Sequence, residues 1–133
     1  MRGRVMMPQK EIIELDMERS NPNLSAATKF GDLVFVSGQT GTHPETGKLG
    51  NGIREQTSYT IERIKVILEK AGTSLDNVLS ATTYLTKRED LSEYNEVYGE
   101  YFVNNKPARA TVEVMLNREE LLVEIMVIAC IPS

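Results

Sequence analysis

The chain has 133 residues with a formal net charge of −4; 41% of its residues are hydrophobic and 26% are charged. This length and composition are typical of one globular domain with a core of its own. The acidic balance argues against nucleic-acid binding, which depends on Lys and Arg neutralising phosphates. No apolar run approaches the roughly 20 residues of a membrane-spanning helix, so we expect no membrane insertion.

The two ends of the chain carry few signals of their own. One cysteine, Cys130, excludes an intrachain disulfide and fits a reducing, cytoplasmic compartment. The first residues include two arginines but lack the apolar stretch of a secretory signal. We therefore predict an N-terminal extension over residues 1–9, with Met6 or Met7 as an alternative start, and a single domain over residues 10–133. Whether the extension is an ordered or a frayed arm stays open.

The first part of the chain predicts two strands. Residues 10–16 give a weak strand pattern, and residues 21–23 form an Asn-Pro-Asn turn. The apolar run over residues 32–37 predicts a second strand, which ends in Gly38. Residues 43–47 are rich in turn formers, and they predict a loop.

From residue 53 the hydrophobic period changes to that of a helix. Gly72, after the last residue of this pattern, suits the left-handed position that follows many helices. The predicted buried face consists of Ile53, Thr57, Ile61, Ile64, Leu68 and Ala71.

The second half of the chain predicts a strand over residues 77–87 and a helix over 89–104, whose acidic start suits a helix N-terminus. A strand over 108–115, a polar turn over 117–120 and a final strand over 121–131 follow. The order β-β-α-β-α-β-β predicts an α+β fold. We expect a two-layer sandwich in which two helices cover one face of a mostly antiparallel sheet.

The final strand is apolar on both faces. Two helices can cover only one of them, so we expect the other to contact a second copy of the chain. One face comprises Val123, Ile125, Val127, Ala129 and Ile131, and the other comprises Met126, Ile128 and Cys130.

Arg109 and Glu124 are charged residues inside otherwise apolar strands. Leaving a buried charge without its partner costs on the order of 3–5 kcal/mol, so each charge indicates a salt bridge or a functional site. Strand alternation puts Arg109 on one face with Thr111 and Glu113. The short turn predicts that the two strands pair as a hairpin. In the simplest register Glu124 lies nearer Glu113 than Arg109, and a bulge would change this.

The functional alternative to a structural Arg–carboxylate bridge is a binding site for a small acid. The planar guanidinium of Arg109 matches a carboxylate through two parallel hydrogen bonds. Glu124 could orient a water molecule or accept its proton. Burial would raise the pKa of Glu124 and a nearby Arg109 would lower it, and the sequence leaves this open. Ser37 and Gly38 could line such a site, since glycine allows close approach of a ligand; a plain turn is the alternative.

Other chemistries find little support. His43 is the only histidine and lies in a turn-rich loop, which disfavours a Ser-His-Asp triad. One His and one Cys do not make a usual zinc site, and we expect no metal. Cys130 lies in an apolar strand and is expected to be a small buried residue. No phosphate-binding glycine motif is present.

Several blocks resemble the YjgF/RidA family of reactive-intermediate deaminases, and the likeness runs from about residue 10 to the C-terminus. The Pro-Ala-Arg block with the late glutamate is the specific part. The blocks are Phe35-Val36-Ser37-Gly38-Gln39, Pro44-x-Thr46-Gly47, Asn95-x-x-Tyr98-x-x-Tyr101-Phe102, Pro107-Ala108-Arg109-x-Thr111-Val112-Glu113-Val114 and Val123-Glu124-Ile125.

This resemblance implies a chorismate-mutase-like α+β fold and a homotrimer with three clefts between subunits. It implies a 2-iminobutanoate/2-iminopropanoate deaminase-like hydrolase of C–N bonds, which converts enamines and imines such as 2-aminoacrylate to 2-oxo acids and ammonia. No metal, flavin or pyridoxal phosphate is implied. By position, Arg109 matches the arginine that holds the substrate carboxylate and Glu124 the glutamate near the attacking water. Ser37 and Gly38 match residues that line the cleft.

The sequence departs from the family pattern at two places. Residues 23–26, Asn-Leu-Ser-Ala, stand where Gly-Pro-Tyr is common, and Thr111 stands where cysteine is common. Thr111 is kept as a substrate-binding candidate. These differences motivate an alternative, a non-catalytic trimer that binds small carboxylic acids. A further alternative is an endoribonuclease or translation inhibitor, against which the acidic charge argues.

Overall fold

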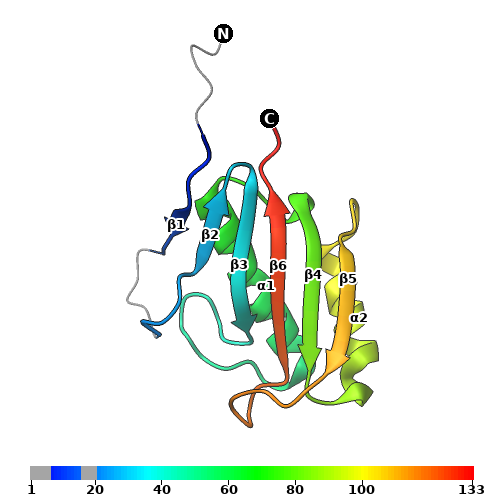
Figure 1. Cartoon of the computed structure of the whole chain (residues 1–133). Helices are drawn as coiled ribbons and strands as arrows, with labels where there is room; N and C mark the ends of the chain where they lie inside the picture. The colour runs from blue at the N-terminus through cyan, green and yellow to red at the C-terminus, as the bar shows by residue number, and fades with distance from the viewer. Residues whose placement is uncertain (1–6, 16–20) are drawn as a thin grey trace.

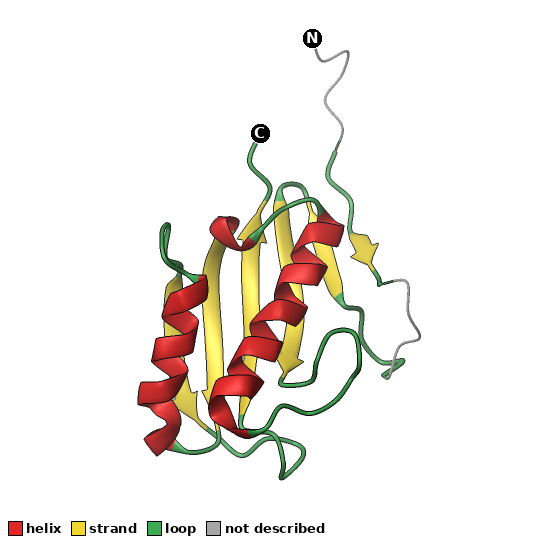
Figure 2. Cartoon of the chain, turned by 180° about the vertical axis from the view of Figure 1, so that it is seen from behind, coloured by secondary structure: helices red, strands yellow, loops and turns green. Residues whose placement is uncertain are grey.

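The computed structural model describes residues 7–15 and 21–133. In this part of the chain six strands form one sheet in the order β1-β2-β3-β6-β4-β5, and two helices pack on one of its faces (Figures 1 and 2). The elements are β1 (Glu11–Ile13), β2 (Ala27–Phe30), β3 (Leu33–Thr40), α1 (Gly52–Ala71), β4 (Val78–Leu85), α2 (Leu91–Tyr101), β5 (Ala108–Glu113) and β6 (Val123–Cys130), with short 3-10 helices at Leu75–Asn77 and Arg88–Asp90.

The predicted α+β sandwich with helices on one face is confirmed. All strand pairs are antiparallel except β4 with β5, which are parallel. Within the described residues neither helix has the length and apolar character needed to cross a membrane. Most of the predicted extension, residues 1–6, lies outside the described residues.

The predicted hairpin of the last two strands is wrong, because β4 lies between β5 and β6. Parallel strands need a crossover, and α2 supplies it between β4 and β5. The loop after β5 is then anchored at the end of β4: the N–H of Val114 donates to Leu85 O (2.8 Å), and the N–H of Thr86 donates to Leu122 O (3.2 Å). These bonds bring β6 to the opposite edge of β4. The polar turn over residues 117–120 is therefore part of a connection that passes the end of β4, and it is not a hairpin loop.

The sequence pattern does not predict the strand β2, which the structure contains. β2 is a short run of Ala-Thr-Lys-Phe, too polar to give a strand pattern, and it pairs with β3 across a two-residue turn. Gly31 occupies the first central position of that turn with φ 60°, which suits a tight hairpin. Farther along the chain, α2 stops at Tyr101, before the predicted end at residue 104.

The predicted face of α1 is confirmed. Every member of the predicted set is buried, and Ile61, Ile64 and Leu68 are fully so. They pack against the inward side chains of β3 and β6 in one core. Gly72 closes the helix with φ 95°, and its N–H donates to Glu69 O, as expected for a left-handed terminus.

The sheet face turned away from the helices is open in the single chain. Phe35 on β3 and Met126 on β6 are 40% and 41% exposed on this face, and Val112 on the edge strand is 44% exposed. The alternation along β6 agrees with the predicted two-faced apolar pattern, since Val123, Ile125 and Val127 are buried. That a second copy covers the open face stays a prediction.

Gln56 fixes the loop that leads into β6. This side chain is only 2% exposed, and its Nε2 donates to Gly50 O (3.2 Å) and to Glu120 O (3.0 Å). Its Oε1 accepts a hydrogen bond from the N–H of Leu122 (2.8 Å). Gly41 packs so closely that a Cβ there would lie 2.5 Å from Gln56 Cβ. One buried amide thus positions the backbone directly before the strand that carries Glu124.

We predict that Gln56→Leu lowers the free energy of unfolding by about 2–4 kcal/mol, because it leaves buried backbone groups without partners. Urea denaturation followed by circular dichroism measures this loss. Gln9→Leu makes the same chemical change at an exposed position and is expected to alter stability little. Equal stability of the two variants would contradict the assigned role of Gln56.

Candidate functional site

A bulge in β3 places Ser37 and Gly38 on the open face of the sheet. Between the pairs Val36–Val127 and Gln39–Ile125, two residues of β3 oppose one residue of β6. The Ser37 N–H donates to Ala26 O (3.0 Å), and its hydroxyl donates to Ser25 O (2.6 Å). These bonds to the stretch before β2 hold the bulged backbone in place.

Gly38 makes room for Glu124. A Cβ on Gly38 would lie 2.9 Å from the carboxyl carbon of Glu124, closer than real contacts allow. Register sets Glu124 between Thr40 of β3 and Tyr84 of β4. Glycine at this point therefore lets the Glu124 carboxylate keep its position, and the plain-turn alternative is wrong because β3 continues through it to Thr40.

Glu124 is half-buried, and burial raises the pKa of its carboxyl above the ordinary glutamate value. Among the described residues it takes part in no ion pair. Within the single chain burial raises the pKa of Glu124, and the distant Arg109 of the same chain does not oppose it. A carboxyl of raised pKa can exchange protons with a substrate nearer neutral pH than an exposed one.

A hollow of about 450 Å³ adjoins this bulge on the open face. Ser37, Phe35 and Met126 line it on the sheet side, and the stretch 22–25 lines it on the other. Glu124 does not line the hollow. Its carboxylate lies against Gly38, the residue that follows Ser37 in β3. The open face therefore offers a hydroxyl, a close backbone approach and a carboxylate in one region.

Arg109 faces the other side of the sheet. β5 is an edge strand, and Arg109 pairs in register with Ala81, whose side chain is buried under the helices. The guanidinium carbon lies 4.7 Å from the ring centre of Tyr98 and 5.4 Å from that of Tyr94, both on α2. Such cation–π contacts are worth about 0.5–1 kcal/mol at exposed sites, and they orient the planar group.

The alternative of a structural salt bridge between Arg109 and a carboxylate is wrong within the described residues. Glu113, on the same face, pairs with Arg88 at 3.2 Å instead. No carboxylate of residues 7–15 or 21–133 pairs with Arg109. Arg109 is exposed at the sheet edge and held by two aromatic rings; the Tyr94 hydroxyl is in hydrogen-bonding reach of its guanidinium, whose five N–H donors exceed this one contact.

The surroundings of Arg109 hold further unused polar groups. The hydroxyls of Thr111 and Tyr98 are buried without a hydrogen-bond partner among the described residues. The Tyr94 hydroxyl is hydrogen-bonded to Thr83, and burial raises the pKa of Tyr94 to about 12 although the positive charge of Arg109 opposes the shift. Tyr94 and Tyr98, which are buried in the core, thus also form the support for Arg109. Their spacing of four residues on α2 was the available signal.

The structure does not bring Arg109 and Glu124 together within one chain. β4 separates their strands, and alternation points their side chains to opposite faces. Ser37 and Gly38 lie with Glu124, whereas Thr111 lies with Arg109. The predicted site residues therefore form two half-sites.

The remaining candidates have structural surroundings. His43 Nδ1 accepts hydrogen bonds from the N–H groups of Glu45 (3.1 Å) and Thr46 (3.2 Å), and its ring contacts Tyr59 edge-on at 5.0 Å. Cys130 is half-buried. No group of three His, Cys, Asp or Glu side chains in the described ranges is placed to hold a metal ion.

Comparisons with known proteins decide the family. A family model described as Endoribonuclease L-PSP matches residues 18–131. A RutC family protein of Pyrococcus abyssi is 48% identical over 106 residues, which cover 79% of this chain and 84% of that protein. TdcF of Escherichia coli, provisionally named a reactive intermediate deaminase, is 31% identical over 103 residues, or 75% of this chain and 80% of TdcF. The chain belongs to the YjgF/RidA family.

Solved structures of the YjgF/RidA family share the fold. RidA from Psychrobacter sp. PAMC 21119 superposes with a TM-score of 0.83 at 36% identity, and the match covers 90% of this chain and 98% of that one. Escherichia coli TdcF with bound serine gives a TM-score of 0.83 at 28% identity with the same coverage. The resemblance seen in the sequence is confirmed, and at least one family member holds a small amino acid.

We predict that Glu124 titrates above the ordinary glutamate value in the folded single chain, where no Arg109 lies beside it, as measured by carboxyl carbon NMR of the dilute, unassembled protein. A raised pKa means that the folded state binds the proton more tightly than the unfolded state. The charged form therefore destabilises the fold once the pH exceeds the unfolded pKa. Glu124→Gln is expected to be more stable than wild type at neutral pH, with the difference vanishing as the pH falls below about 4. A titration at or below the ordinary value would refute this.

Proposed function

We propose that this protein hydrolyses reactive 2-imino acids, and the enamines in equilibrium with them, to 2-oxo acids and ammonia. The observation that carries the proposal is the Arg109 guanidinium, which has no carboxylate partner in the described chain and is oriented by two aromatic rings. A planar cation in this state suits a small carboxylate. TdcF, provisionally named a reactive intermediate deaminase, supports the reaction class.

We further propose that the site forms between two copies of the chain in a homotrimer. The open face carries Ser37, Gly38 and Glu124 beside exposed apolar side chains that favour cover by another surface. The edge strand β5 presents Arg109 and Thr111. A neighbouring β5 placed against the open face brings its Arg109 to the Glu124 of the first copy and completes the two half-sites.

The chemistry follows from these roles. Arg109 holds the carboxylate of the 2-imino acid and fixes the C=N carbon beside one water molecule. Glu124 accepts a proton from the water as its oxygen bonds to that carbon and passes this proton to the imine nitrogen, which gives a carbinolamine and leaves Glu124 as a carboxylate. The carbinolamine then collapses: Glu124 moves the hydroxyl proton to the amine nitrogen, the C–N bond breaks, and the carbonyl and ammonia form. Water is the only co-reactant, so the reaction needs no metal or organic cofactor.

Thr111 is assigned to substrate binding beside Arg109. Its buried hydroxyl lacks a partner in the described chain and could hydrogen-bond a substrate oxygen. The stretch at residues 23–25 contributes backbone and a leucine to the hollow, where the family commonly has a tyrosine. We expect these differences to alter which side chain the 2-imino acid carries. A cytoplasmic location stays a prediction.

We predict that Arg109→Met lowers kcat/KM for freshly generated 2-aminoacrylate or 2-iminobutanoate by at least about 100-fold, since two charge-assisted hydrogen bonds are lost. Release of 2-oxo acid, coupled to a dehydrogenase, measures this. Arg118→Met removes an exposed arginine paired with Glu120 and is expected to keep wild-type turnover. Equal turnover by both variants would reject the role of Arg109. If 2-oxobutyrate binds in calorimetry and no imine turns over, the protein is a carboxylate-binding trimer instead.

We also predict complementation between two inactive variants. Arg109→Met and Glu124→Gln, refolded together at equal amounts, restore about one quarter of wild-type activity if each site takes one residue from each of two neighbours in randomly mixed oligomers. Each variant refolded alone is the control. If mixing recovers nothing although mass spectrometry detects mixed oligomers, the shared site is wrong.

A further inference from the structure

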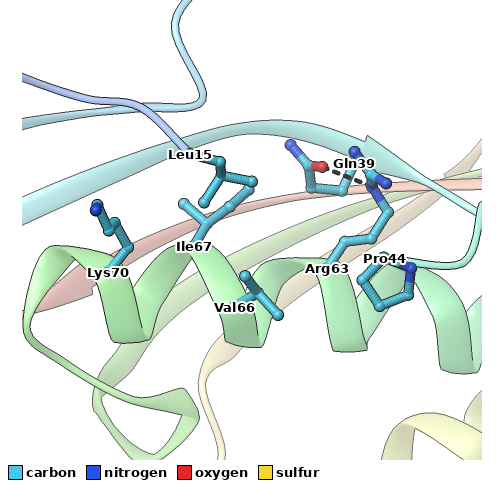
Figure 3. A pocket seen from close by; sticks show the side chains of 7 residues that line it. All are labelled: Leu15, Gln39, Pro44, Arg63, Val66, Ile67 and Lys70. Carbon is cyan, nitrogen blue, oxygen red and sulfur yellow. Dashed lines mark hydrogen bonds between the residues drawn. The ribbon is translucent and has the colours of Figure 1, made fainter. Parts of the chain in front are cut away.

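A second cavity lies on the helix side of the sheet, opposite the face that carries Glu124. It has a volume of about 390 Å³, within the range of roughly 300–1,000 Å³ usual for small-molecule sites. Its walls are mainly apolar and come from Leu15, Pro44, Val66 and Ile67 (Figure 3). Neither Arg109 nor Glu124 lines it, so it is separate from both half-sites.

Arg63 of α1 reaches across this cavity toward the end of β3 (Figure 3). It is half-buried, and its Nε donates to Gln39 Oε1 at 3.0 Å. Burial lowers the pKa of Arg63, and no carboxylate of the described chain pairs with it. Its terminal nitrogens donate to no atom in the described ranges. A cation removed from water with one neutral partner gains most from an anion.

The arrangement of charges along the cavity suits an elongated ligand. Lys70 follows Arg63 by two turns on the same helix, which is about 10.5 Å along the axis. Leu15 and Ile67 lie between the two cations in Figure 3. The apolar floor beside Arg63 fits a molecule with an anionic head and a hydrocarbon body.

We propose that this cavity is a binding site for a small amphipathic anion, whose carboxylate or phosphate group binds Arg63 and whose apolar part packs on Leu15, Val66 and Ile67. The proposed assembly uses the opposite face of the sheet, so the cavity stays accessible in it. Arg63 acts here as the specificity group, because an apolar cavity alone would accept a neutral ligand equally well.

Gln39 connects this cavity to the bulge on the other face. It is buried, and while its Oε1 accepts from Arg63, its Nε2 donates to Ser37 O at 2.9 Å. An anion that draws the Arg63 guanidinium away takes the donor from Gln39 Oε1. The Gln39 side chain can then reorient, which changes its hydrogen bond to Ser37 O. Ligand binding is therefore expected to perturb Ser37 and Gly38. The regulatory meaning of this link rests on the proposed function, whereas the binding site does not.

The test titrates hexanoate and phenyl phosphate into the full chain and follows backbone amide resonances, with hexanol as the neutral control. We expect saturable shifts at Leu15, Val66 and Ile67 with both anions and none with hexanol. Arg63→Met is expected to weaken binding by about tenfold or more in calorimetry. Lys65→Met, the same charge loss at an exposed position of α1, is expected to keep wild-type affinity. A preference for one anion identifies the head group as carboxylate or phosphate.

The same titration in Arg109→Met separates this proposal from the proposed function. Binding that persists there and disappears in Arg63→Met assigns the anions to the cavity. Arg63→Lys keeps the charge and is expected to retain part of the affinity, which guards against a folding defect in Arg63→Met. Binding insensitive to both Arg63 variants, or shifts confined to Phe35 and Met126 on the open face, would overturn the site. Shifts in the cavity without any at Ser37 and Gly38 would reject the link through Gln39.

Discussion

The position of β4 between β5 and β6 is the constraint on which the rest of this structure depends. It makes β5 an edge strand and puts β6 in the interior of the sheet. Because side chains alternate along each strand, Arg109 then faces α2 and Glu124 faces the open side. A chain with a β5–β6 hairpin could have joined these groups across one strand pair. The observed order separates the two groups onto opposite faces of the sheet.

Each half-site is shaped by contacts that leave one group available. Because Gly38 lacks a Cβ, the Glu124 carboxylate can pack against the β3 bulge. Burial at this position raises the pKa of Glu124. Tyr94 and Tyr98 hold Arg109 by their ring faces and do not neutralise its charge. Aromatic rings orient a guanidinium without using up its hydrogen bonds to oxygen. Neither group forms an ion pair with another described residue of the chain.

Arg109 and Arg63, which pair with no carboxylate among the described residues, lie in contrasting settings. Arg109 is exposed at an edge and supported by aromatic rings, whereas Arg63 is half-buried beside an apolar cavity and bonded to a neutral amide. The first suits a compact acid in a site completed by another surface. The second suits an anion with a hydrocarbon body in a cavity already present in one chain. Gln39 connects that cavity to the Ser37 bulge through two hydrogen bonds.

The sequence by itself determined the elements with strong local patterns and the identity of the charged candidates. The α1 face, its end at Gly72 and the isolated charges of Arg109 and Glu124 follow from periodicity and from the cost of burying a charge. Only the tertiary structure decided which strands are neighbours. Pairing of β5 with β4 is set by the crossover of α2 and the anchoring of the following loop, which are contacts between distant segments. Which face a side chain meets, and hence what it can do, depends on that pairing.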